Sequence, residues 1–445
     1  MMNLIDEIVA YTDEFRRRAV EPEAIVRAKQ LVLDTMGVCV SSWNEPSIAA
    51  IFASAEAESG KELATVYGTG KKAPVEQAIV CNGALTRVQD YMDVYYSLDA
   101  SHPSEYIPFT LACCEAWNLT GDDALRGIIL AYDLQGWITE NLRCNRNGWH
   151  YATFASAVSA AVVALLRNLS AEQLANTIAI SCSTNLTALG TGPQTDMKTL
   201  AFALAAQNVL MSARLAANGC TGPRDTLETL LGITGNAGKE FPPLRPEHPR
   251  ILKTSIKPYP SEFMAHSALE ALESILQQQT LAAEQVDKIC VRVHQWATWI
   301  ARESSYHPHN RQEADHSLPY CIAARIVAGK LDQSEFQNRY WENEAVLALM
   351  QKIRVVADDA LEALYPQARP AIVEITCKDG RVLTARVDHP LGDYRNPMTQ
   401  AQVEEKFRDC VKGTMDDEKA QRVIDAVDQM QSHPSASLTE LMVWE

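Results

Sequence analysis

Apolar residues recur at steps of three and four over most of the first 240 positions, a spacing typical of helices that bury one face. Residues 21–37 form one such predicted helix, with an apolar face at Ile25, Ala28, Val32 and Met36. Residues 152–166 are small and apolar on every side, which indicates a helix enclosed by others, and Ser170 is the predicted N-cap of the next helix. A further helix is predicted over 197–219, with Gly219 at its C-terminal end.

The pattern changes after the proline-rich stretch 241–250. Residues 286–294 alternate between apolar and polar, as in a half-buried strand, and 371–389 read as a β-hairpin with an Asp-Gly turn at 379–380. Helical periodicity returns after Pro397. These segments predict mixed helices and strands followed by a second helical region.

We therefore predict a mostly α fold with a smaller α+β domain. The helical domain is expected over 1–250, the α+β domain over 251–392, and C-terminal helices at 393–445 are expected to return to the helical domain. The length of 445 residues and the 47% of hydrophobic positions are enough for sizeable cores.

The charge balance limits the class of partner. Forty Lys and Arg residues against 56 Asp and Glu residues give a net charge of −16, which repels phosphate backbones and anionic lipid. Neither nucleic acid nor a membrane is an expected partner. The N-terminus carries acidic residues within its first seven positions, and no run approaches the roughly 20 apolar residues of a membrane-spanning helix. We expect a cytoplasmic protein in which positive charge is gathered locally if the substrate is anionic.

Motifs for metals and cofactors are absent from the sequence. The eleven cysteines include no C-x-x-C pair, which argues against a zinc ribbon and the usual iron–sulfur motifs and favours buried thiols. There is no H-E-x-x-H, and the two histidines of 307–309 lie in a proline-containing loop without an evident carboxylate frame. The glycines of 68–73 favour a surface turn over a nucleotide site. No metal and no cofactor are predicted.

Four segments concentrate ionisable residues without being apolar stripes or solvated charge runs. They are 89–105 with Asp90, Asp93, His102 and Ser104; 194–198 with Lys198; 255–272 with Lys257, Tyr259 and His266; and 307–320 with Arg311, Asp315, His316 and Tyr320. Each histidine taken singly is more often a hydrogen-bonded structural residue than a catalytic one. Together the segments contain the groups that chemistry beside a carboxylate requires.

Removing a proton next to a carboxylate needs a base that titrates near neutral pH and cations that stabilise the developing negative charge. Histidine is such a base. Arg311 can hold a carboxylate through two hydrogen bonds, and Lys198 or Lys257 can act as a point charge or, when desolvated, as an acid or base. A protonated histidine or a tyrosine would then serve the departing group.

The chain also resembles a known family along nearly its whole length. The stretches that carry the resemblance are APVEQAIVCNGALTRVQDYMD, SHPSE, GWHYATFASAVSAA, MKTLAFALAAQNVL, ANGCTGP, LKTSIKPYPSEF, RQEADHSLPY and YPQARPAIVEITCKDGR, followed by RNPMT and EEKF. It is identified by them as a member of the MmgE/PrpD family, which includes 2-methylcitrate dehydratases, cis-aconitate decarboxylase and iminodisuccinate epimerase.

The resemblance implies a helical domain made from both chain ends, an inserted α+β lid domain, a homodimer, and an active cleft between the domains. It also implies a small di- or tricarboxylate as substrate, without an iron–sulfur cluster. The residues that match family motifs are Asp93, His102, Lys198, His266 and the pair Asp315-His316. The predicted catalytic residues are His102, His266, Lys198, Asp93, His316 and Tyr320, and the predicted substrate-binding residues are Lys257, Arg311, Ser104 and Asp90.

Two departures from the dehydratase pattern bear on the substrate. Met92 stands where dehydratase relatives usually have Asn, and Met264 stands where they tend to have His, directly after the P-x-E-F motif. His266 falls instead at the spacing of decarboxylase and epimerase relatives. The segments TSIKPYPSEF and RQEADHSLPY look dehydratase-like.

We therefore favour a cofactor-independent lyase that dehydrates a hydroxylated di- or tricarboxylate of the 2-methylcitrate or citrate type. In this hypothesis His266 or His102 removes the α-proton, His316 and Tyr320 assist the leaving hydroxyl, and Lys198, Lys257 and Arg311 hold carboxylates. One alternative is a decarboxylase of the cis-aconitate type or a dicarboxylate epimerase. Another alternative, motivated by the two methionines, is a non-catalytic member that acts as a binding protein.

Overall fold

The computed structural model describes residues 3–56, 60–189 and 195–444, which form two compact units. Unit 1 contains Met1–Val88, Met92–Ser255 and Thr399–Glu445, and unit 2 contains Gln89–Tyr91 and Ile256–Met398. The short segment Gln89–Tyr91 thus belongs to unit 2, although its neighbours in the sequence belong to unit 1. Unit 1 is helical and unit 2 mixes helices with a sheet, which confirms the predicted fold class.

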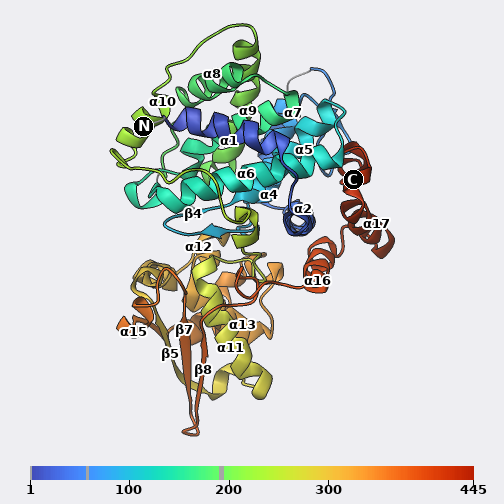
Figure 1. Ribbon diagram of the computed structural model, residues 1–445. Coiled ribbons are helices and arrows are strands. Elements are labelled where there is room, and N and C mark those ends of the chain that lie inside the picture. The colour runs from blue at the N-terminus through green and yellow to red at the C-terminus, as the bar shows by residue number, and fades with distance from the viewer. Residues whose placement is uncertain (1–2, 57–59, 190–194, 445) are drawn as a thin grey trace. The chain divides into compact units, whose positions relative to one another are not determined.

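Unit 1 is built from helices and two very short hairpins (Figure 1). The helices are α1 (Leu4–Arg17), α2 (Pro22–Ser41), α3 (Pro46–Glu56), α4 (Val75–Arg87), α5 (Tyr106–Ala116), α6 (Gly121–Asn141), α7 (Ala155–Arg167), α8 (Ala171–Cys182), α9 (Met197–Ala217), α10 (Thr226–Ile233), α16 (Gln400–Val411), α17 (Asp417–Asp428) and α18 (Ala436–Thr439). The hairpins pair β1 (Ala64–Thr65) with β2 (Lys72–Ala73), and β3 (Tyr95–Tyr96) with β4 (Ala100–Ser101).

The helices predicted from periodicity are confirmed, and their ends follow capping chemistry. The Ser170 side chain accepts from the backbone of Gln173 at the start of α8, and the Gln173 side chain bonds back to Ser170. Asn168 ends α7 in the left-handed conformation, and Gly219, with φ +88°, follows the C-cap of α9. Short polar or glycine residues at these positions satisfy backbone groups that the helix leaves open.

The expectation that no segment is long and apolar enough to span a membrane was wrong for α9. The helix Met197–Ala217 is long and apolar enough to cross a membrane by length and composition alone. Just over half of its most apolar stretch is buried inside the structure, as is usual for a core helix. Its small residues, such as Ala203, let α4 approach closely, and Gly83 of α4 faces that alanine.

The C-terminal helices pack on the N-terminal part of unit 1, and α16 lies along α2. Lys406 of α16 and Asp34 of α2 form a buried ion pair with 2.5 Å between Nζ and Oδ1. Beside this pair, Gly37 leaves so little room that an added Cβ would lie 3.1 Å from the ring of Phe407. The two helices are therefore joined by an ion pair, and their close approach leaves no room for a side chain at Gly37.

Unit 2 contains a four-stranded sheet in the order β6-β5-β7-β8, with β5 parallel to β6 and the other pairs antiparallel. Its elements are α11 (His266–Gln278), β5 (Val286–Val293), α12 (Arg311–Asp315), α13 (Leu318–Ala328), α14 (Glu344–Met350), β6 (Ile353–Ala357), α15 (Asp359–Glu362), β7 (Ala371–Cys377) and β8 (Val382–Val387).

The predicted strand and hairpin of unit 2 are confirmed. Alternate residues of β7 are buried, and α11 packs on β7 and β8 (Figure 1). Gly380 adopts φ +87° in the turn between β7 and β8, a conformation that glycine takes without steric cost. This frame holds the segment 256–265 that leads into α11.

Candidate active site

In unit 1, the chain between α4 and α5 builds a buried carboxylate site around Asp93. Asp93 is fully buried, and its two oxygens accept hydrogen bonds from the Ser104 backbone N–H at 3.1 Å and the Tyr132 hydroxyl at 2.7 Å. Burial raises the pKa of Asp93 to about 6, although the hydrogen bonds from Ser104 and Tyr132 oppose that rise. The carboxyl therefore titrates closer to neutral pH than an exposed aspartate does.

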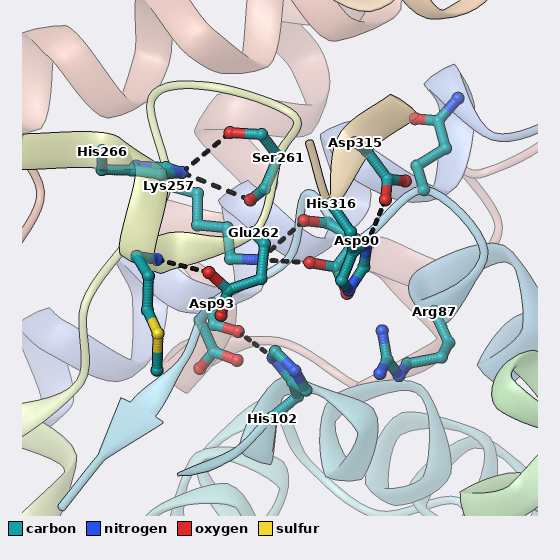
Figure 2. Close-up of polar contacts among 12 residues, drawn as sticks. Arg87, Asp90, Asp93, His102, Lys257, Ser261, Glu262, His266, Asp315 and His316 are labelled. Atoms are coloured by element: carbon teal, nitrogen blue, oxygen red, sulfur yellow. Dashed lines mark hydrogen bonds and ion pairs between the residues drawn. The ribbon is translucent and has the colours of Figure 1, made fainter. Parts of the chain in front are cut away.

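His102 is oriented by the backbone of the same segment (Figure 2). Its Nδ1 lies 2.6 Å from the carbonyl oxygen of Asp93. Because a carbonyl oxygen only accepts, Nδ1 carries the hydrogen, and Nε2 is the nitrogen that can take up or deliver a proton. The sequence-predicted residues Asp93, His102 and Ser104 are thus brought together by the structure.

A second group in unit 1 includes residues that the sequence reasoning missed. The Tyr151 hydroxyl donates to the buried carboxylate of Glu105, and Arg87 Nε lies 3.9 Å from the same side chain. The ring of Tyr151 lies 6.0 Å from that of His102 and 4.2 Å from that of His150. The Tyr151 ring therefore lies near both histidines.

His150 is a buried histidine that stays neutral. Its Nδ1 accepts from the backbone N–H of Ala152, so Nε2 carries the hydrogen of the neutral ring. Burial, together with the positive charges of Arg87 and Lys198, lowers the pKa of His150 to about 3. The charges of Arg87 and Lys198 thus act on a ring that carries a neutral N–H donor, and Arg87 also lies against the Glu105 carboxylate.

In unit 2, Lys257 and Asp90 bind each other. Lys257 is 1% exposed, and its Nζ donates at 2.7 Å to both the carbonyl oxygen and the carboxylate Oδ2 of Asp90 (Figure 2). Asp90 has φ +53°, a left-handed conformation that Asp tolerates better than most residues. This backbone conformation turns both oxygens toward one ammonium group.

A carboxylate–histidine group lies in the same unit. The buried Asp315 accepts a hydrogen bond from His316 Nδ1, which leaves Nε2 of His316 as the nitrogen for proton exchange. The backbone N–H of Glu262 donates to the Asp315 carbonyl at 2.8 Å. Burial raises the pKa of Glu262, while the charges of His316 and Lys257 lower it. Glu262 is a further residue that the sequence reasoning did not select.

Three predicted site residues of unit 2 lie enclosed by structural contacts. His266 is fully buried, with Nε2 facing the carbonyl and hydroxyl oxygens of Ser261. The Tyr320 hydroxyl donates to the backbone carbonyl of Glu335. Arg311 donates at 2.8 Å to the side chain of Gln333 and at 3.4 Å to the carbonyls of residues 89 and 336.

Metal ligands are not clustered in the described parts of the chain. Within them, no group of three or more His, Cys, Asp or Glu side chains is arranged to hold a metal ion. Nine of the eleven cysteines are buried, Cys290 is half-buried and Cys220 is exposed.

Comparisons with known proteins match two family models, and the second of them extends past unit 2 into the C-terminal helices of unit 1. Residues 6–240 match the MmgE/PrpD N-terminal domain, and residues 259–431 match the MmgE/PrpD C-terminal domain. The 2-methylcitrate dehydratase of Escherichia coli K12 is 26% identical over 360 residues, covering 74% of each chain. The mitochondrial 2-methylcitrate dehydratase of Yarrowia lipolytica is 26% identical, covering 78% of this chain and 72% of its own. The cis-aconitate decarboxylase of Mus musculus is 22% identical, covering 94% and 89%.

Proposed function

Since the chain belongs to the MmgE/PrpD family, we propose that it is a lyase that removes water from a hydroxylated tricarboxylate, with 2-methylcitrate the leading substrate. The observation that carries this proposal is that His102 and His316 are each fixed through Nδ1 by an oxygen acceptor. Each therefore presents Nε2 for proton exchange. Dehydration needs one base and one acid, and each of these histidines, one in each unit, has a nitrogen suited to such a role.

In the proposed reaction, the neutral ring of His102 removes the proton next to a carboxylate. The C–H electron pair forms the new double bond as the C–OH bond breaks. The protonated ring of His316 delivers its Nε2 proton to the departing hydroxyl, which leaves as water. Asp315 stabilises the charged form of His316 by accepting its other N–H.

In this proposal, Arg87, Lys198 and His150 of unit 1 stabilise the negative charge that develops on the substrate carboxylate. Arg87 and Lys198 supply positive charge, and the neutral His150 supplies an N–H donor. Because Lys257 is already bound to Asp90, we assign this pair to holding the segment 89–91 in place rather than to binding a carboxylate. We also assign supporting roles to His266, Tyr320 and Arg311, because their side chains make hydrogen bonds to other parts of unit 2.

A second candidate reaction is decarboxylation of a substrate such as cis-aconitate. It is favoured by the mouse relative, which aligns over 94% of this chain. In that reaction the C–C bond to a carboxylate breaks, carbon dioxide leaves, and a protonated histidine delivers a proton to the carbanion. The same residues suffice, because both reactions pass through negative charge beside a bound carboxylate. Epimerisation also needs only removal and return of a proton.

Product analysis separates these reactions. Purified protein treated with chelator is incubated with 2-methylcitrate, citrate, cis-aconitate and iminodisuccinate, and products are followed by absorbance of the conjugated double bond and by mass spectrometry. Loss of water supports the proposed dehydratase. Loss of carbon dioxide, or a change of configuration alone, replaces it with one of the alternatives. Absence of turnover and of binding across all four compounds contradicts the lyase and favours a non-catalytic binding protein.

A further inference from the structure

Glu105 is a buried carboxylate that joins three separate segments of unit 1. It is 1% exposed and ends a short 3₁₀ turn, in which its backbone N–H donates to the carbonyl of His102 at 3.2 Å. Its Oε2 accepts from the Tyr151 hydroxyl, and its Oε1 lies 3.9 Å from Nε of Arg87, the last residue of α4. The segments that Glu105 joins carry His102, Arg87 and His150, which all have roles in the proposed reaction.

The ring of Tyr151 lies near the two histidines of unit 1. Its centroid is 4.2 Å from that of His150, with 32° between the ring planes, and 6.0 Å from that of His102, with 60° between the planes. Tyr151 is buried, and its hydroxyl, at the far end of the ring from the backbone, is bound to Glu105. The ring is therefore fixed at both ends, and it limits in turn how the two imidazole rings can rotate.

Tyr151 keeps its proton and is the donor in the contact with Glu105. Burial and the negative charge of Glu105 raise the pKa of Tyr151 well above its usual value. An ionised carboxylate only accepts hydrogen bonds, so a protonated hydroxyl is the partner it needs. The hydrogen bond therefore persists over the whole neutral range of pH.

Stability alone does not account for a charged side chain at this place. Removal of a carboxylate from water is costly, and a buried ion pair can often be replaced by apolar side chains without loss of stability. An apolar side chain at position 105 could not accept the hydrogen bond that fixes the Tyr151 ring. A buried charge beside two histidines is typical of a functional site.

We propose that Glu105 is a positioning residue, whose carboxylate fixes the Tyr151 ring and thereby holds the imidazoles of His102 and His150 in the orientation that turnover needs. The proposal rests on the lyase function proposed above, in which His102 removes a proton and His150 supplies an N–H donor. Proton transfer needs the reacting atoms in a narrow range of geometry, and a displacement of about 1 Å can lower the rate by roughly 10²-fold. Glu105 thus acts on the rate through Tyr151.

Three variants separate the hydrogen bond from the charge. Tyr151→Phe removes the hydroxyl but leaves Glu105 beside Arg87, and it should lower kcat for 2-methylcitrate by roughly 10²-fold with little change in KM. Glu105→Met removes the acceptor and should have the same effect. Glu105→Gln keeps an acceptor oxygen without the charge and should retain kcat within about 10-fold of the wild type, because a neutral hydrogen bond is weaker but still orients the ring.

Glu115 provides a matched control for the loss of a buried carboxylate. It is also buried in unit 1, and it also binds one hydroxyl and one cation: it accepts from the Thr65 hydroxyl at 2.6 Å and lies 3.4 Å from Nζ of Lys72. Glu115→Gln should lower the melting temperature without lowering kcat of the folded protein.

The NMR signals of the two histidines give a readout that does not depend on turnover. An aromatic ring at 4.2 Å shifts the resonances of the His150 ring protons, so these should move when the Tyr151 ring is no longer fixed. We expect them to move in Tyr151→Phe and Glu105→Met, and to stay in place in Glu105→Gln and Glu115→Gln. The His102 signals should follow the same order with smaller changes, since its ring lies further from Tyr151.

The outcomes distinguish this inference from the proposed function. Slow turnover and moved signals in Tyr151→Phe, with both near wild type in Glu105→Gln, support the positioning role. A wild-type kcat and unmoved signals in Tyr151→Phe overturn it and leave the lyase standing. Equal losses of kcat in Glu105→Gln and Glu105→Met at an unchanged melting temperature also overturn it, because the charge then matters and not the hydrogen bond. If the wild-type protein turns over no compound of the panel, the lyase is overturned, and the role of Glu105 in turnover with it.

Discussion

The hydroxyl of Tyr132 donates a 2.7 Å hydrogen bond to the fully buried carboxylate of Asp93. The bond stabilises the ionised form of a group whose pKa is nonetheless raised to about 6 by burial. Asp93 therefore binds more protons in the folded protein than in the unfolded chain between about pH 4 and pH 6. Ionisation of Asp93 opposes folding, and its contribution to stability falls as pH rises through that window.

This predicts a measurable pH dependence of unfolding. For a shift from 3.8 to about 6, the contribution of Asp93 to the free energy of unfolding should fall by ~3 kcal/mol between pH 3 and pH 7. The free energy of unfolding is measured by urea unfolding, followed by tryptophan fluorescence, at several pH values. It should fall by this amount more in the wild-type protein than in Asp93→Asn. Tyr132→Phe removes a hydrogen bond that stabilises the ionised form of Asp93. In this variant the fall in stability should therefore extend to higher pH. Parallel curves for the wild-type and Asn proteins would contradict the assignment.

His102 is expected to be essential for turnover but not for folding. His102→Asn removes the base that the Asp93 carbonyl orients, and kcat should fall by about 10²- to 10⁴-fold. His309→Ala is the matched control, because the His309 side chain is 81% exposed and pairs with Glu313 on the surface. The melting temperatures of both variants should stay near that of the wild type. Equal rates in the two variants would exclude His102 as the base.

Asp315 is expected to act through His316. Asp315→Asn keeps the shape of the side chain but no longer fixes the hydrogen of His316 on Nδ1. We expect kcat to fall by roughly 10²- to 10⁴-fold, with a smaller change in KM, because the ring is no longer held in the tautomer that the reaction needs. A kcat near that of the wild type together with a reduced melting temperature would indicate a purely structural role.

His150 is expected to remain uncharged over the working range of pH. Its pKa of about 3 lies below the usual 6.5, so its nitrogen signals in NMR should show a neutral ring with hydrogen on Nε2 from pH 5 to pH 9. His150→Ala should lower kcat by about 10²- to 10³-fold, as loss of one anion-stabilising donor does, and His150→Gln should retain more activity because its amide can donate. A titration of His150 near neutral pH would contradict this description.

Much of the fold could be predicted from sequence because local patterns carry it. The helix that Ser170 caps and the hairpin that turns at Gly380 depend on periodicity and on residues a few positions apart. The pairing of Lys257 with Asp90 depends on tertiary structure, and no local spacing indicates it. The assignment of Gln89–Tyr91 to unit 2 also depends on tertiary structure, and no local pattern in the sequence indicates it.

The candidate site was predicted in part. Asp93, His102 and Ser104 share a short segment, so their proximity follows from the chain itself. Arg87 ends a helix and His150 precedes an apolar one, so each looked like part of an ordinary helix in the sequence. The homodimer and the cytoplasmic location stay predictions.

The packing of α16 on α2 affects the order in which the protein can be completed during synthesis. The face of α2 that carries Asp34 is covered by a helix that begins at Gln400, so it is translated long before its cover exists. All residues of unit 2 emerge from the ribosome before unit 1 can close. A nascent chain that stops before Thr399 would carry the Asp34 carboxylate without its lysine and an open apolar surface around Gly37. Such a chain is a natural target for chaperones until the last segment arrives.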